Sequence, residues 1–225
     1  MIEAANNLSP NIIKYVSVER ISDEIKKAQK HAELFFTEAE VLGFLHEILP
    51  EVSNLKSKEK ELWLAHIKNS EAKNEIVYFA AILIPIYLYK AESKAASLKM
   101  SRHTSKGIGI LNKLVPQLDK EITPSKLRDI MVEAKDYFND VKDFYCEVAD
   151  NSIGAKATIE KISSFEDKVR ESIQIPFING EYLIKAGLKP SPVFKLILDD
   201  CGRLQAEGKS YSEVEEFAQL KIQSL

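Results

Sequence analysis

Apolar residues recur at helical spacing along nearly the whole chain, and this pattern limits the fold more than any other feature. Near the N-terminus, Ile12, Val16, Ile21 and Ile25 repeat at intervals that place them on one side of a helix. Segments of alternating polar and apolar residues, which would indicate strands, are absent, and only 8 of the 225 residues are glycine. The sequence therefore predicts an all-α protein.

The most apolar stretch runs from Ile76 to Tyr89 and is interrupted by Pro85. A membrane-spanning helix needs roughly 20 apolar residues, whereas runs of about 10–14 are typical of buried helices. Proline removes a backbone donor and clashes with the preceding turn. We therefore predict a central buried helix that kinks or ends near Pro85, and no membrane span.

Charge and cysteine usage narrow the class of protein. The formal net charge is −3, so no global positive field attracts nucleic acid. Cys146 and Cys201 are too few and too far apart for a disulfide scaffold, which indicates a reducing compartment. Because no charged-then-apolar leader opens the chain, we expect a cytoplasmic location, with an organellar matrix as the alternative.

One region is nevertheless strongly basic. Between residues 90 and 113 there are six bases and a single acid, Glu92, which gives a local charge of +5. The six bases are Lys90, Lys94, Lys99, Arg102, Lys106 and Lys113. If one helix continues through the region, they share one broad side, although Gly107 and Gly109 favour a break after Lys106. Such a stripe can neutralise RNA phosphates, and the alternative is a solvated lysine-rich face.

The segment from Ile178 to Leu198 predicts a helix–turn–helix corner. Gly180 and Gly187 tolerate positive φ, and Pro192, which follows Pro190, suits the first turn of a second helix. Lys185, Lys189 and Lys195 surround this corner, and the second helix begins with N–H groups that can bind a phosphate. From Glu171 onward, however, eight acids outnumber six bases.

This corner resembles the tail of class II tRNA nucleotidyltransferases, the CCA-adding enzymes, and of the related bacterial poly(A) polymerases. Two further segments resemble the same family: 16–24, which contains Glu19, Arg20 and Glu24, is similar to its neck-helix motif, and 43–51 to its Gly-Leu-Leu turn. The three motifs stand in the family's order. The resemblance implies partial neck helices over 1–52, a helical body over 53–150 and a helical tail over 151–225.

The resemblance also implies a function, namely tRNA processing by CCA addition. This chain would bind RNA and hold the acceptor arm and elbow of a tRNA while a catalytic head adds nucleotides. Neither the metal-binding Asp-x-Asp nor the nucleotide-templating motif of that head is found here, so we expect the chain to be inactive alone. Mg²⁺ and ATP or CTP would belong to the head, and no cofactor or metal is expected in this chain.

Partners follow from the same resemblance. We expect tRNA, together with either a head subunit in trans or self-association through the N-terminal neck, where Ile2, Leu8 and Ile12 would lack a covering surface. The family's neck motif is structural, so Arg20 and Glu24 are expected to form an ion pair; a catalytic acid–base set is the alternative. The alternative function is an all-helical interaction scaffold without RNA binding. A self-contained enzyme has no supporting constellation, since the four histidines are scattered.

Overall fold

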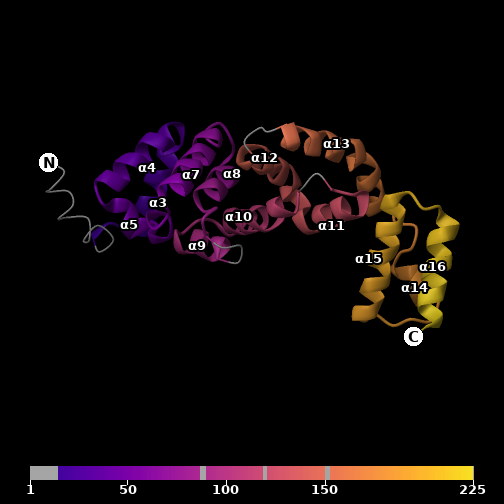
Figure 1. The fold of residues 1–225 in the computed structure, drawn as a ribbon. Helices are drawn as coiled ribbons and strands as arrows, with labels where there is room; N and C mark the ends of the chain where they lie inside the picture. The colour runs from indigo at the N-terminus through magenta and orange to yellow at the C-terminus, as the bar shows by residue number, and fades with distance from the viewer. Residues whose placement is uncertain (1–14, 87–89, 119–120, 150–152, 225) are drawn as a thin grey trace. The chain divides into compact units, whose positions relative to one another are not determined.

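A computed structural model describes residues 15–86, 90–118, 121–149 and 153–224 (Figure 1). These residues form helices joined by turns, and no strand occurs among them, so the predicted all-α class is confirmed. Most helices are short, and among the described residues two pairs of consecutive helices are joined by a single 3-10 turn. In chain order the elements are α3 (Val18–Lys27), η2 (Ala28–His31), α4 (Ala32–Val41), α5 (Phe44–Ile48), α6 (Pro50–Ser53), α7 (Ser57–Asn69), α8 (Glu75–Ile82), α9 (Ala91–Ser97), α10 (Arg102–Leu114), η3 (Val115–Gln117), α11 (Pro124–Ala134), η4 (Lys135–Tyr137), α12 (Phe138–Val148), α13 (Ile153–Gln174), α14 (Gly180–Lys185), α15 (Pro192–Glu207) and α16 (Tyr211–Gln223).

The chain divides into two compact units. Unit 1 comprises residues 1–117 and 139–152, and unit 2 comprises residues 118–138 and 153–225. The chain therefore enters unit 2 with α11, returns to unit 1 with α12, and enters unit 2 again with α13. Residues 118–138, which the three-part division assigns to a body, share a unit with the expected tail. The break expected near Asn151–Gly154 falls largely on residues that lie outside the described ranges.

Helix α8 forms the centre of unit 1. All its residues from Ile76 to Ile82 are buried, and Asn74 caps it by accepting the Val77 N–H at 3.1 Å. The helix ends at Ile82, three residues before Pro85, which confirms the predicted stop. Two buried hydrogen bonds hold α8 in place. Trp63 Nε1 donates to the carbonyl of Ile82, the last residue of the helix, at 3.0 Å, and the Tyr78 hydroxyl donates to the Ile25 carbonyl at 3.2 Å.

Unit 2 is built on α11, α13 and α15. Helix α11 packs against both α13 and α15. At its N-terminus the Thr123 hydroxyl accepts the Lys126 N–H at 3.3 Å, and Pro124 follows at the first helical position, where proline is favoured. Helices α14, α15 and α16 enclose a second, smaller cluster of buried side chains. These are Ile178, Leu183, Ile197, Cys201, Val214 and Ala218.

Within the described ranges, none of the helices has both the length and the apolarity that crossing a bilayer requires. The long helix α13 alternates charged and apolar residues, and the apolar α8 has only 8 residues.

Candidate nucleic-acid interface

The basic region folds as two helices joined by a tight turn, and not as one continuous helix. Helix α9 ends at Ser97, where the Met100 N–H bonds the Ala95 carbonyl at 3.2 Å and the Lys99 N–H bonds that of Ala96 at 3.0 Å. Lys99 takes a positive φ of 61°, the left-handed conformation that usually closes a helix. Ser101 then caps α10 by accepting the Thr104 N–H at 3.0 Å. The break thus falls before Arg102.

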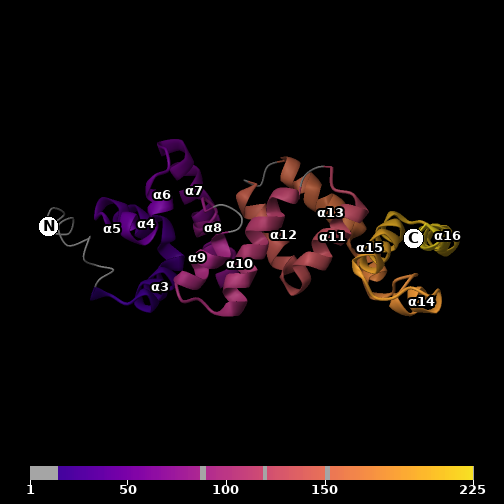
Figure 2. The same ribbon diagram turned by 90° about the horizontal axis from the view of Figure 1, so that it is seen from below.

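Helix α10 continues through both glycines that were expected to interrupt it. Gly107 and Gly109 lie inside α10, and a Cβ added at Gly109 would stand 2.8 Å from the Cβ of Glu92 on α9. The missing side chain therefore lets α9 and α10 pack closely, and Figure 1 and Figure 2 both show the two helices side by side. The apolar faces of this pair, including Ala95 and Leu111, are buried, which leaves the basic side chains on the outside.

Five of the six predicted bases of this region are exposed. They are Lys90, Lys99, Arg102, Lys106 and Lys113. Lys99, Arg102 and Lys106 surround the turn and the first turn of α10, whereas Lys113 lies in its last turn, roughly 16 Å from Arg102 along the axis. Lys90 is the N-cap residue of α9 and lies at the end of that helix opposite the turn. We call the exposed group formed by Lys99, Arg102 and Lys106 the α9–α10 basic corner. None of these three forms an ion pair within the part of the chain that the structure describes.

Lys94 differs from its neighbours. Its ammonium group lies 3.2 Å from Glu51 Oε2, and its side chain is only 19 % exposed. The charge is therefore already neutralised inside unit 1, where it joins α9 to α6. We leave Lys94 out of the basic corner for this reason.

Electrostatics at the corner are not compensated locally. No acidic residue occurs between Glu92 and Asp119, and the first turn of α10 contains Arg102 but no acid. Helix N-termini carry a partial positive charge and normally attract carboxylates. The bases here add to that positive potential instead, so the corner is suited to an external anion.

The tail corner forms as predicted, with one correction. Asn179 caps α14, Gly187 takes φ 92° after it, and Ser191 caps α15 ahead of Pro192 by accepting the Phe194 N–H at 3.2 Å. Gly180 does not adopt positive φ; it is the first residue of α14, and a Cβ there would make an ordinary 3.7 Å contact with the Phe194 ring. The first residue of a helix has a negative φ that any residue can adopt, so the backbone does not require glycine at position 180.

The tail lysines are exposed at this corner. Lys185 ends α14, Lys189 lies in the turn beside Pro190, and Lys195 lies in the first turn of α15. They belong to unit 2, whereas the α9–α10 basic corner belongs to unit 1. The structure therefore presents two separate groups of cations.

The neck motif is partly different from the expectation. Glu19 and Arg20 are exposed in α3, whose apolar Ile21 and Ile25 are buried. Glu24 Oε1 forms an ion pair with Lys27 Nζ at 2.9 Å, and not with Arg20. The partner of Glu24 therefore lies toward the C-terminus of α3, where the basic residues Lys26 and Lys27 form the last turn.

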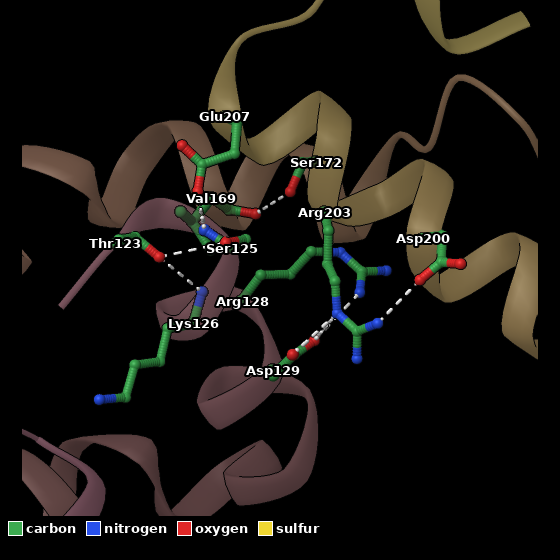
Figure 3. Close-up of polar contacts among 10 residues, drawn as sticks. All are labelled: Thr123, Ser125, Lys126, Arg128, Asp129, Val169, Ser172, Asp200, Arg203 and Glu207. Carbon is green, nitrogen blue, oxygen red and sulfur yellow. Dashed lines mark hydrogen bonds and ion pairs between the residues drawn. The ribbon is translucent and has the colours of Figure 1, made fainter. Parts of the chain in front are cut away.

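Sequence reasoning missed a polar cluster that joins α11 to α15 (Figure 3). Arg203 Nε donates to Asp129 Oδ2 at 2.9 Å and its Nη1 donates to Asp200 Oδ1 at 2.9 Å, and the hydrogen bond to Asp129 raises the pKa of Arg203. Arg128 is only 8 % exposed, and burial lowers the pKa of its guanidinium. Its guanidinium occupies the space that a side chain at Gly202 would need.

This cluster is a helix–helix contact, because Asp129 and Asp200 both pair with Arg203, and Asp129 Oδ1 also lies 3.9 Å from Arg128 Nη1. The only signal in the sequence was a glycine, Gly202, inside a helical pattern. Its neighbour Arg128 is apparent only in the structure, where α11 packs on α15. Among the described residues no group of three or more His, Cys, Asp or Glu side chains is placed to hold a metal ion.

Comparisons with known protein families, with curated proteins and with solved structures found no match for this chain.

Proposed function

We propose that this chain binds the phosphate backbone of RNA, with tRNA as the first substrate to test, and that the α9–α10 basic corner is the contact surface. The observation that carries the proposal is the uncompensated positive charge at the start of α10. Lys99, Arg102 and Lys106 are exposed there, and the nearest acids along the chain are Glu92 and Asp119. Lysine and arginine side chains held on a rigid surface bind phosphates without reading bases.

The choice of RNA rests on the resemblance of the neck, turn and tail motifs to tRNA nucleotidyltransferases. On that proposal the chain holds a tRNA, and the tail lysines Lys185, Lys189 and Lys195 add a second contact from unit 2. The chemistry of nucleotide addition would belong to a separate catalytic head. The proposal concerns holding alone.

The test is a filter-binding titration with a tRNA lacking its 3′ CCA, repeated over a series of salt concentrations. If the three cations of the corner contact phosphates, the slope of log affinity against log salt should be about −2 to −3, since each contact contributes roughly −0.7 to −0.9. A slope near zero, or no binding at low salt, would contradict the proposal and leave the interaction scaffold as the better interpretation.

A charge-matched pair of variants locates the surface. Lys99→Glu combined with Arg102→Glu should abolish binding, because it reverses two charges at the corner. The control combines Lys30→Glu with Lys58→Glu, two exposed lysines of unit 1 that change the total charge equally. Equal losses in both variants would show that only the overall charge matters. A duplex DNA of similar length, titrated in parallel, separates RNA recognition from general polyanion binding.

A further inference from the structure

An apolar groove of about 520 Å³ lies on the surface of unit 1. Val16, which precedes α3, and Ile21 within α3 line one side, and α4 lines the other with Leu34 and Phe35. Residues of α5, Phe44 among them, complete the lining. Pockets of roughly 300–1,000 Å³ with apolar walls are large enough to receive several side chains of a partner.

The same surface also carries a projecting apolar side chain. Leu34 lines the groove yet is 63 % exposed, the largest exposed fraction of any leucine among the described residues. A groove and a projecting side chain on one surface are the two halves of a self-complementary contact. In such an interface each copy offers the same residue as a knob and the same groove as a hole.

Four titratable side chains line the groove: Arg20 and Glu24 of α3, His31 of η2 and Glu38 of α4. Glu24 is already paired with Lys27, whereas neither Arg20 nor Glu38 forms an ion pair within the described parts of the chain. A two-fold axis along the groove places α3 of one copy opposite α4 of the other. Arg20 of each copy then faces Glu38 of the other copy, so the dimer contains two Arg20–Glu38 ion pairs. A strongly basic or strongly acidic partner would match only one of the two.

We infer that a second copy of this chain covers the groove, and that the protein forms a two-fold symmetric dimer through α3 and α4. Leu34 of each copy enters the groove of the other, and two Arg20–Glu38 pairs close the edges. This inference does not depend on RNA binding, because none of the three residues of the α9–α10 basic corner lines the groove.

The experiment is sedimentation equilibrium of the full chain over a range of concentrations. The mass should rise from the 25.4 kDa of one chain toward twice that value. Leu34→Glu should raise the dissociation constant about tenfold or more, because it places a charge in the centre of the contact. Leu62→Glu is the matched control, since Leu62 is also exposed, at 48 %, but lies on α7 outside the groove. Circular dichroism of both variants verifies that they fold.

Charge exchange tests the symmetry. Arg20→Glu and Glu38→Arg should each weaken association, because each creates two like-charge contacts. An equimolar mixture of the two variants should associate again, since every contact then joins opposite charges. A chain that stays monomeric up to about 0.5 mM would overturn the inference. So would equal effects of Leu34→Glu and Leu62→Glu, or a mixture that associates no better than the single variants.

Discussion

At the scale of one residue, the backbone conformation of Lys99 in the α9–α10 basic corner lowers the stability of the fold. Its φ of 61° is unfavourable for a residue with a Cβ, by roughly 1–2 kcal/mol, and helices commonly end on glycine at this position. Lys99 lies beside Arg102 in the proposed phosphate contact. A lysine in a position that favours glycine is what one expects if the side chain is used for binding.

Lys99→Gly should therefore stabilise the fold and weaken RNA binding. We expect the free energy of unfolding to rise by about 1 kcal/mol or less, because the relief of backbone strain at positive φ is partly offset by the greater flexibility of glycine in the unfolded chain. The salt slope of RNA binding should fall by roughly 0.7–0.9, the contribution of one phosphate contact. Urea melts and filter binding measure the two effects.

Lys135→Gly provides the comparison. Lys135 is the other described non-glycine residue with positive φ, 51°, and it lies in unit 2 at the end of α11. It should gain stability without losing RNA affinity. If both variants weaken binding equally, Lys99 has no special role in the contact.

Glu213 gives a second prediction at this scale, on pH. A hydrogen bond from Lys209, together with two from Ser210, lowers the pKa of Glu213 from 4.5 to about 2. A carboxylate with a depressed pKa stabilises the fold above its unfolded pKa, and that stabilisation is lost as pH falls toward 2. The N-terminus of α16 should thus fray between about pH 4.5 and pH 2.

The measurement is hydrogen exchange of the first turn of α16 as a function of pH. Glu213→Gln keeps the shape of the side chain but removes the titration, so its protection should no longer depend on pH in that window. A wild-type chain whose α16 protection is constant down to pH 2 would contradict the assignment.

At the scale of elements, the glycines of α10 act as contacts and not as breaks. Alanine is normally better than glycine inside a helix by about 1 kcal/mol. At Gly109, however, the added methyl group would overlap the Cβ of Glu92 at 2.8 Å, and such overpacking costs about 1–3 kcal/mol.

Gly109→Ala should consequently destabilise unit 1 by about 1–2 kcal/mol, opposite to the helix-propensity rule. Gly180→Ala should stay within about 0.5 kcal/mol, because its Cβ would meet only the Phe194 ring at 3.7 Å. Thermal melts of the two variants decide the matter. A stabilised Gly109→Ala variant would show that α9 and α10 pack less closely than described.

Sequence patterns predicted some elements better than others. The run of buried residues in α8, its end before Pro85, and the Pro192 start of α15 follow from local rules, and the structure has all three. The break between α9 and α10 was placed wrongly. No glycine or proline marks it, because the turn is made by Lys99 and capped by Ser101.

At the scale of the whole molecule, unit 2 is assembled from two separate stretches of chain. Helix α11 supplies the surface on which α13 and α15 pack, and Ser125 donates its N–H to Glu207 at 3.0 Å. Residues 153–225 alone would expose the faces of α13 and α15 that pack on α11, and would leave Arg203 without Asp129. We therefore expect residues 153–225 to fold poorly without α11.

We predict that a fragment of residues 118–225 unfolds cooperatively, whereas a fragment of residues 153–225 does not. The reason is the loss of the buried Leu127 and Ile130 contacts, each worth about 1.5–3 kcal/mol of apolar burial. Circular dichroism melts of both fragments measure the difference. A sharp transition in the shorter fragment would show that α14, α15 and α16 suffice as a core.

The sequence by itself determined the helical class, the central buried helix and the caps of α11 and α15, because these depend on side chains within a few residues of one another. Only the tertiary structure decided which bases stay available: Lys94 is neutralised by Glu51, 43 residues away in the chain, while Lys99 and Arg102 remain exposed. It also decided that Gly109 and Gly202 admit a neighbouring helix. Charge pairing and close approach are set by distances in space, which local spacing along a chain does not encode.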